Sequence, residues 1–161
     1  LAFWDGYVAA FSLVSLGSCQ HEELYGSAQL CGSSVQEKGL CFCSQGGRLF
    51  TGTSAGCVLM FTPVLQYIFR ISFSIDSAWD VEIYSTAAIS DGVLFGCADG
   101  TLYKVLNSGK YSKYDKYDNP IYSLCVNNDL SLLMVGLEFG IQVLCTKTMQ
   151  CICAKACLRA L

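Results

Sequence analysis

The sequence predicts an all-β protein made of repeated four-stranded antiparallel sheets, and three observations support this fold class. A short apolar run, a Gly-x-x-x-Gly turn and a second apolar run occur three times in the 161 residues. The glycines that close these turns, Gly56, Gly100 and Gly140, are spaced by 44 and then 40 residues. The apolar runs are short and rich in β-branched or aromatic residues, which favours strands over helices. A strand-containing repeat of about 40 residues is typical of the blades of a β-propeller.

The first predicted blade is incomplete. Residues 5–11 form a weak copy of the hairpin within a partial blade at residues 1–38. Three complete blades follow at residues 39–78, 79–118 and 119–161. A propeller typically has about four to eight blades. We therefore expect this chain to be a portion of a larger ring, with a free-standing ring of four blades as the alternative. The open blade faces of a partial ring are expected to be covered by missing blades, by a partner chain or by a second copy.

Each complete blade is expected to begin with an apolar inner strand. Residues 83–88 and 121–126 both start with Ile-Tyr-Ser, and residues 39–43 hold the equivalent place in the blade before them. The central hairpin comes next. The fourth strand of each blade is more polar and is expected at the outer edge. The predicted outer strands are residues 66–70, 110–114 and 150–154.

The repeated glycines are interpreted as turn residues. A hairpin turn of this kind needs at least one residue with φ > 0, which glycine adopts without a Cβ clash. A phosphate-binding loop would need Lys-Ser or Lys-Thr after the glycines and a helix beyond them, and the sequence has neither there. Gly56, Gly100 and Gly140 are therefore predicted to close the three central hairpins.

Two pieces of the repeat resemble the WD40-repeat family. They are the turn Ala-Asp-Gly-Thr-Leu at residues 98–102 and the inner strand that starts Ile-Tyr-Ser-Leu at residue 121. The resemblance covers roughly residues 39 to 154. It implies a degenerate WD40 propeller that acts as a non-catalytic scaffold, holds protein partners in a larger eukaryotic complex and carries no cofactor.

The chain also departs from the WD40 pattern. Its only histidine, His21, does not follow a glycine, and the third strands of the blades do not end in Trp-Asp. The pair Trp79-Asp80 matches literally but lies before an inner strand. The family's hydrogen-bond network from His to Asp is therefore expected to be absent. Apolar packing between the sheets is expected to stabilise the blades in its place.

The expected binding positions lie on loops, because loops on a rigid scaffold often carry function. Trp79 is the first position to test, since tryptophan is enriched at interface hot spots; its alternative role is packing between blades. The predicted partner-binding residues are Trp79, Asp80, Asp99, Tyr117, Asn119 and Glu138.

Composition limits the classes of partner. Hydrophobic residues make up 53% of the chain and charged residues 14%, which is below the usual quarter or so and indicates extensive burial. The net charge of −3 argues against nucleic acid. Lysines and tyrosines alternate at residues 110–120, but two aspartates offset the positive charge. This run is interpreted as an exposed blade edge, with protein binding as the alternative.

One segment is apolar enough to suggest a membrane span. Residues 49–69 carry no charge, and about 20 apolar residues can span a bilayer as a helix. The segment contains Gly52, Gly56 and Pro63, and it aligns with the hairpins of the next two blades. It is therefore interpreted as core strands, which argues against a membrane partner.

The chain has eleven cysteines, an odd number scattered through the predicted strands. This pattern favours free thiols that fill core positions in a reducing compartment, the cytoplasm or nucleus, over a disulfide framework. The cysteines predicted at core positions are Cys41, Cys57, Cys97, Cys125 and Cys145. The remaining hypothesis is a metal site near the end of the chain, because thiolates bind zinc. Its candidate ligands are Cys145, Cys151, Cys153 and Cys157.

Two alternative functions stay open. Residues 91–103 also resemble a repeat of the quinoprotein dehydrogenases, which implies a propeller enzyme carrying pyrroloquinoline quinone. However, the chain has no adjacent cysteines, its only tryptophans are Trp4 and Trp79, and His21 has no evident catalytic partner. The second alternative is a coat or tethering propeller of the secretory pathway.

Overall fold

The computed structural model describes residues 2–4, 7–11, 24–29, 38–73 and 81–156. Within these residues it contains strands and no helix. No helix long and apolar enough to cross a membrane is therefore found in the described part of the chain. The uncharged segment at residues 49–69 instead supplies strands of one sheet.

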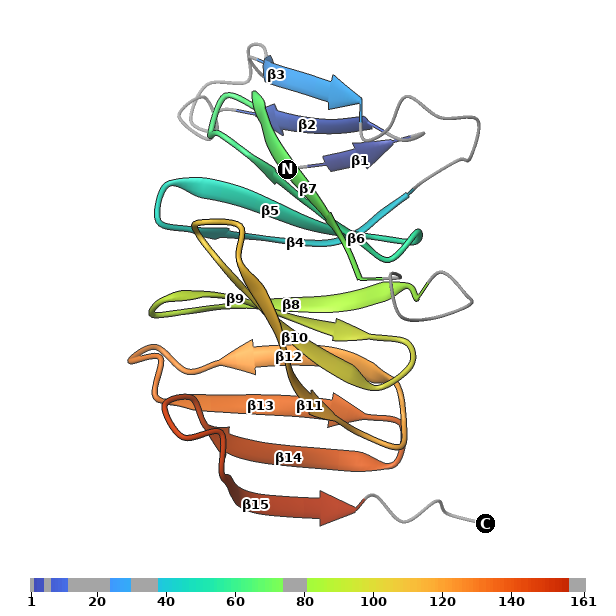
Figure 1. Cartoon of the computed structure of the whole chain (residues 1–161), viewed down its shortest axis with the longest axis vertical. Helices are drawn as coiled ribbons and strands as arrows, with labels where there is room; N and C mark the ends of the chain where they lie inside the picture. Colours follow the sequence, from blue (N-terminus) through green and yellow to red (C-terminus); the bar gives the residue numbers. More distant parts are fainter. Residues whose placement is uncertain (1, 5–6, 12–23, 30–37, 74–80, 157–161) are drawn as a thin grey trace, which may run out of the picture.

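Three four-stranded antiparallel sheets follow one another along the chain (Figure 1). The first contains β4 (Gly39–Gln45), β5 (Arg48–Thr53), β6 (Cys57–Phe61) and β7 (Tyr67–Ser72). The second contains β8 (Ile83–Ile89), β9 (Gly92–Cys97), β10 (Thr101–Leu106) and β11 (Tyr111–Lys116). The third contains β12 (Ile121–Val126), β13 (Leu132–Leu137), β14 (Gly140–Cys145) and β15 (Cys151–Ala156). In each sheet the strands lie side by side in chain order.

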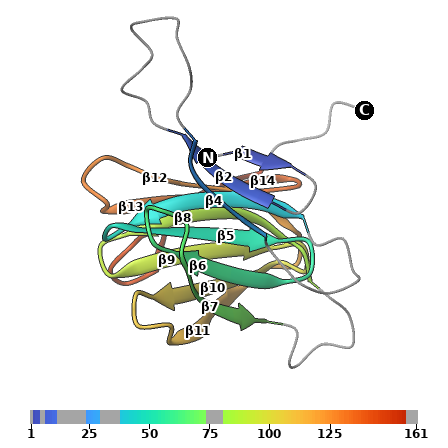
Figure 2. The ribbon, with the colours of Figure 1, turned by 90° about the horizontal axis from the view of Figure 1, so that it is seen from above.

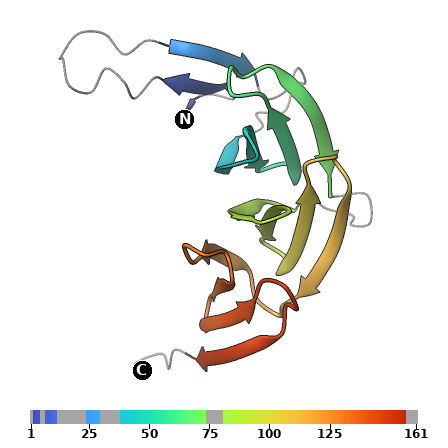
Figure 3. The same ribbon diagram turned by 90° about the vertical axis from the view of Figure 1, so that its left-hand side faces the viewer.

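The sheets are arranged as an arc, which is the arrangement of propeller blades (Figure 3). The first strand of each sheet lies on the concave side of the arc, where β4 contacts β8 and β8 contacts β12. Viewed along the stack, the sheets overlie one another (Figure 2). The predicted all-β propeller of four-stranded antiparallel blades is therefore confirmed, including the inner and outer positions of the first and fourth strands.

A three-stranded sheet lies at the N-terminal end of the arc and corresponds to the predicted partial blade. Its strands are β1 (Ala2–Trp4), β2 (Tyr7–Phe11) and β3 (Leu24–Gln29), in that order. Because β3 precedes the inner strand β4, it holds the place of an outer strand. The innermost position of this sheet has no strand among the described residues.

Two apolar cores hold the three complete sheets together. Each core lies between neighbouring sheets, because alternate residues of a strand point to opposite faces. Between the first two complete sheets the core includes Phe50, Val58, Val93 and Phe95. Between the second and third it includes Leu94, Leu102, Ile121 and Leu133. Strand β9 contributes to both cores, and all six of its residues are buried.

Two of the predicted turn glycines adopt the expected backbone. Gly56 has a φ of 68° and Gly100 a φ of 82°. A Cβ on Gly56 would lie 2.7 Å from the carbonyl oxygen of Val81. Gly140 differs, because it is the first residue of β14 and has no positive φ. The backbone of β15 explains its identity, since a Cβ there would lie 2.5 Å from the Lys155 carbonyl oxygen.

Candidate partner-binding face

Four of the six predicted partner-binding residues are described, and they lie at one end of the sheets. Asp99 is in the β9–β10 turn, Tyr117 and Asn119 are in the β11–β12 loop, and Glu138 is in the β13–β14 turn. Trp79 and Asp80 lie outside the described residues.

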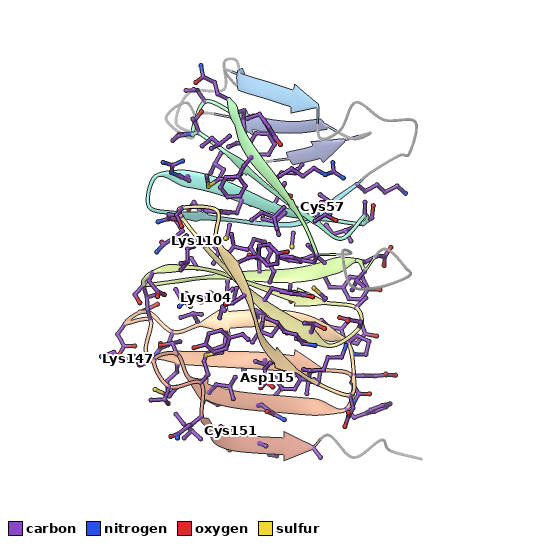
Figure 4. All side chains as sticks on the ribbon, in the orientation of Figure 1. Cys57, Lys104, Lys110, Asp115, Lys147 and Cys151 are labelled. Carbon is purple, nitrogen blue, oxygen red and sulfur yellow. The ribbon has the colours of Figure 1, made fainter. Side chains whose placement is uncertain are left out.

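These turns and loops form one surface. The amide of Tyr117 donates to the Gly100 carbonyl at 2.9 Å, which joins the β11–β12 loop to the β9–β10 turn. Asn119 and Phe139 both line a hollow of about 200 Å³. The β13–β14 turn, which carries Phe139, therefore lies near the β11–β12 loop, which carries Asn119. We call residues 98–100, 117–120 and 138–139 the loop face. The turns that carry Lys110 and Lys147 lie at the opposite edge of the sheets (Figure 4).

Asp99 is held by its own sheet. Its carboxylate accepts hydrogen bonds from the Thr101 amide at 2.9 Å, the Thr101 hydroxyl at 2.7 Å and the Lys116 ammonium at 2.7 Å. Partial burial favours the neutral acid, but the hydrogen bonds from Lys116 and Thr101 outweigh this effect and lower the pKa of Asp99. Asp99 therefore stabilises the turn by linking it to Lys116 of the outer strand β11. That Asp99 also binds a partner stays a prediction.

Tyr117 also has a structural role. Its side chain is half-buried and packs against the core between the second and third complete sheets. Burial raises the pKa of Tyr117 to about 12, and the negative charge of Asp115 adds to the effect. The hydroxyl therefore stays protonated at neutral pH, and the ring stabilises the loop.

The inner strands carry a stripe of exposed and half-buried side chains that were not among the predicted site residues. The rings of Tyr84 and Tyr122 stack across β8 and β12, with centroids 5.7 Å apart and planes inclined by 6°. Leu40 has the equivalent position in β4; it is 40% exposed and Tyr122 is 52% exposed. We call Leu40, Tyr84 and Tyr122 the inner-strand stripe. The repeated Ile-Tyr-Ser is the sequence signal that could have revealed its two tyrosines.

The stripe begins next to the loop face, because its members are the second residues of their strands. Glu82 lies just before β8 and forms a hydrogen bond with the Tyr84 hydroxyl, which raises the pKa of Tyr84. The stripe therefore combines apolar and aromatic surface with a carboxylate.

The cysteines are free thiols throughout the described residues. Burial raises the pKa of Cys41 to about 12 and that of Cys43 to about 11, and it also raises the pKa of Cys97. These thiols are protonated at neutral pH. The core prediction is confirmed for Cys57 and Cys97, which are buried, whereas Cys41 and Cys145 are half-buried. It is wrong for Cys125, which is exposed because no further sheet covers this side of the third complete sheet among the described residues.

The suggested metal site has no support in the described part of the chain. There, no three His, Cys, Asp or Glu side chains gather in a way that could hold a metal ion. Cys151 and Cys153 are exposed on β15, and Cys145 ends β14. Cys157 lies outside the described residues.

The fold has known structural relatives, although the sequence itself matches no known family. No protein-family model matches the sequence, and no curated protein is significantly similar to it. Among solved structures, Sqt1 of Saccharomyces cerevisiae superimposes with a TM-score of 0.72 at 17% identity, covering 96% of this chain and 47% of that chain. The fold is that of a β-propeller. The computationally designed Ika8 protein superimposes on this propeller with a TM-score of 0.66 at 14% identity, covering 98% of this chain and 48% of Ika8.

A third structure extends the comparison. The computationally designed Ika4 protein has a TM-score of 0.58 at 15% identity, covering 76% of this chain and 72% of Ika4. The chain thus spans about half the length of Sqt1 and of Ika8. At sequence identities this low, the structural similarity shows the fold alone.

Within this propeller, the expectation about stabilisation is incomplete. We expected apolar packing alone where the family's His–Asp network is missing. The second complete sheet has a polar network at its β9–β10 turn, in which Lys116 and Thr101 donate to Asp99. A lysine on the outer strand thus stabilises the aspartate of the turn. The lysine and tyrosine run at residues 110–120 is thus more than an exposed edge at Lys116.

Proposed function

We propose that the chain is a non-catalytic scaffold that binds a protein partner through the loop face and the inner-strand stripe. The observation that carries this proposal is the stacked pair Tyr84 and Tyr122, since Tyr122 is 52% exposed although it lies on a rigid inner strand. Aromatic side chains fixed in this way contribute binding energy at a small entropy cost. A partner working in a eukaryotic cytoplasm or nucleus fits the free thiols.

The chemistry of the stripe favours a partner segment with a basic side chain. An arginine or lysine can lie over a tyrosine ring and pair with a nearby carboxylate. Tyr84 and Glu82 offer both groups, and Glu82 is close enough to raise the pKa of the Tyr84 hydroxyl. The proposed ligand is therefore a peptide segment that inserts a cationic residue beside Tyr84.

The two alternative functions have no further observation in their favour. Residues 91–103, which resemble a quinoprotein repeat, form the β9–β10 hairpin, and the core between sheets accounts for most of their apolar side chains. A coat or tethering propeller would use the same fold, so localisation of the protein in cells would separate it from the proposed scaffold.

The test compares the proteins that co-purify with the chain from cells that express it. We expect the amount of co-purified partner to fall at least tenfold in the double variant Tyr84→Ala and Tyr122→Ala. Tyr67→Ala is the matched control, because Tyr67 is 58% exposed but lies on the outer strand β7. Equal recovery of the same partners with the double variant would contradict the proposal.

A further inference from the structure

The contact between neighbouring sheets repeats in a fixed form. The first residue of one inner strand packs on a glycine in the second strand of the preceding sheet. Ile83 packs on Gly52, and Ile121 packs on Gly96. A Cβ on Gly52 would lie 2.5 Å from Cγ2 of Ile83, so only glycine leaves room for this side chain. Both isoleucines are fully buried.

The same isoleucine is also held through its backbone. The third residue of the preceding inner strand donates a hydrogen bond to the isoleucine carbonyl. The Ser85 hydroxyl donates to Ile121 at 3.2 Å, and the Cys41 thiol donates to Ile83 at 3.5 Å. The glycine and the hydroxyl or thiol lie directly opposite each other on paired strands. Together they form a docking pair for the next inner strand.

The third complete sheet carries this docking pair without an isoleucine on it. Gly136 and Ser123 are opposite each other in β13 and β12, as Gly96 and Ser85 are in β9 and β8. The three atoms nearest to a Cβ on Gly136 all belong to Ser123, whereas the nearest atom to a Cβ on Gly52 or Gly96 belongs to the docked isoleucine. The Gly136–Ser123 pair is thus unoccupied by any strand among the described residues.

Equivalent side chains around the pair differ sharply in burial. Two residues before the glycine, Phe50 and Leu94 are 1% and 0% exposed, whereas Met134 is 41% exposed. Directly opposite the glycine, Val58 and Leu102 are both 0% exposed, whereas Ile141 is 39% exposed. The open face of the third complete sheet therefore has apolar side chains at the positions that are buried between the other sheets.

We propose that the open face of the third complete sheet binds the inner strand of a further propeller sheet in a partner polypeptide. The partner strand places an isoleucine or valine over Gly136, and the carbonyl of that residue accepts a hydrogen bond from the Ser123 hydroxyl. The two internal examples define this chemistry. The inner strands β4, β8 and β12 already belong to sheets, so the partner strand comes from outside the described residues. This contact is separate from the loop face.

The test measures binding of a fluorescent synthetic hairpin that copies residues 119–137. The hairpin supplies an inner strand starting with Ile121, paired with its own second strand, and it carries Gly136→Val so that it does not bind itself. We expect saturable binding to the whole protein by fluorescence anisotropy. Replacement of Ile121 by Ala in the hairpin should weaken binding at least tenfold.

Variants of the protein test the same contact from the other side. Gly136→Val should weaken binding at least tenfold, because its side chain occupies the place of the isoleucine. If Gly136→Val fails to fold, Ile141→Asp replaces it, because Ile141 is exposed and a charge there should also weaken binding of an apolar strand. Ser123→Ala should weaken binding about twofold to tenfold, as expected for one lost hydrogen bond. Ser112→Ala, another exposed strand serine, should bind like the unchanged protein.

Three results would overturn the proposal. One is binding that does not saturate, and another is equal affinity for the isoleucine and alanine hairpins. The third is self-association of the protein without the hairpin, seen by sedimentation and abolished by Gly136→Val. That result would identify a second copy of the chain as the occupant of this face.

Discussion

Asp99 shows how a single charged side chain can stabilise a hairpin turn. The carboxylate receives three hydrogen bonds, two from Thr101 and one from Lys116. Because Asp99 and Lys116 are both partly exposed, solvent screening reduces the value of their ion pair. The hydrogen bonds to the turn, which fix its shape, are therefore the larger contribution.

The lowered pKa of Asp99 predicts a specific acid dependence. A carboxyl group whose pKa is lower in the folded than in the unfolded chain stabilises the fold above its unfolded pKa, here 3.8, and loses this contribution as the pH falls through the folded value. The unfolding free energy of the unchanged protein should exceed that of Asp99→Asn by about 1 kcal/mol near neutral pH. The difference should shrink below about pH 4 in urea titrations. A constant difference from pH 7 to pH 2 would contradict this account.

Thiol reactivity is a second prediction at this scale. Hydrogen bonds from Thr148 lower the pKa of Cys145, whereas burial raises the pKa of Cys97. Because the thiolate is the reactive form, iodoacetamide should modify Cys145 at least tenfold faster than Cys97 in the folded protein. Mass spectrometry of digests would measure both rates. In urea the two rates should converge, and equal rates in the folded protein would contradict the assignment.

At the scale of elements, local pattern predicted the strands well. The predicted inner strand at residues 121–126 is β12, and that at 83–88 is β8 apart from one residue. Gly140 was misjudged because a short two-residue turn precedes it, so the constraint comes from the neighbouring β15 and not from the turn. Close approach of two backbones depends on strands distant in sequence, which a local pattern cannot reveal.

The candidate site was only partly predictable for a related reason. Loop positions such as Asp99 and Asn119 were found from the hairpin pattern. The stacking of Tyr84 on Tyr122 joins strands 38 residues apart, and it follows from the distance between blades and not from either strand alone. The exposure of Cys125 likewise depends on which sheet lies next to it.

Substitution of turn glycines tests the hairpins. Gly100→Ala should destabilise the protein by about 2–4 kcal/mol, because a Cβ there combines a left-handed backbone with overlap of the Tyr117 and Asn119 carbonyls. Gly47→Ala is the matched control, since Gly47 has a φ of 68° but no atom within 4 Å of the added Cβ. It should cost about 1–2 kcal/mol. Equal urea midpoints for the two variants would show that the carbonyls move away freely.

At the scale of the whole molecule, the two faces of the last sheet in the arc differ in burial. Leu133 faces the core and is fully buried, whereas its neighbour Met134 faces outward. Leu133→Ala should lower the unfolding free energy by about 2–5 kcal/mol. Met134→Ala should change it by less than about 1 kcal/mol. Similar losses in urea denaturation for both variants would mean that the outward side is covered in solution.

The arrangement of contacts also decides how the molecule comes apart. Among the described residues, the main contacts between complete sheets join neighbouring sheets, chiefly through β4 with β8 and β8 with β12. Stability in such an array is approximately a sum of unit and nearest-neighbour terms. A mechanical load applied to the ends of the chain would therefore be relieved by peeling one sheet at a time. The extension trace of a single molecule would record this as successive steps and not as one rupture.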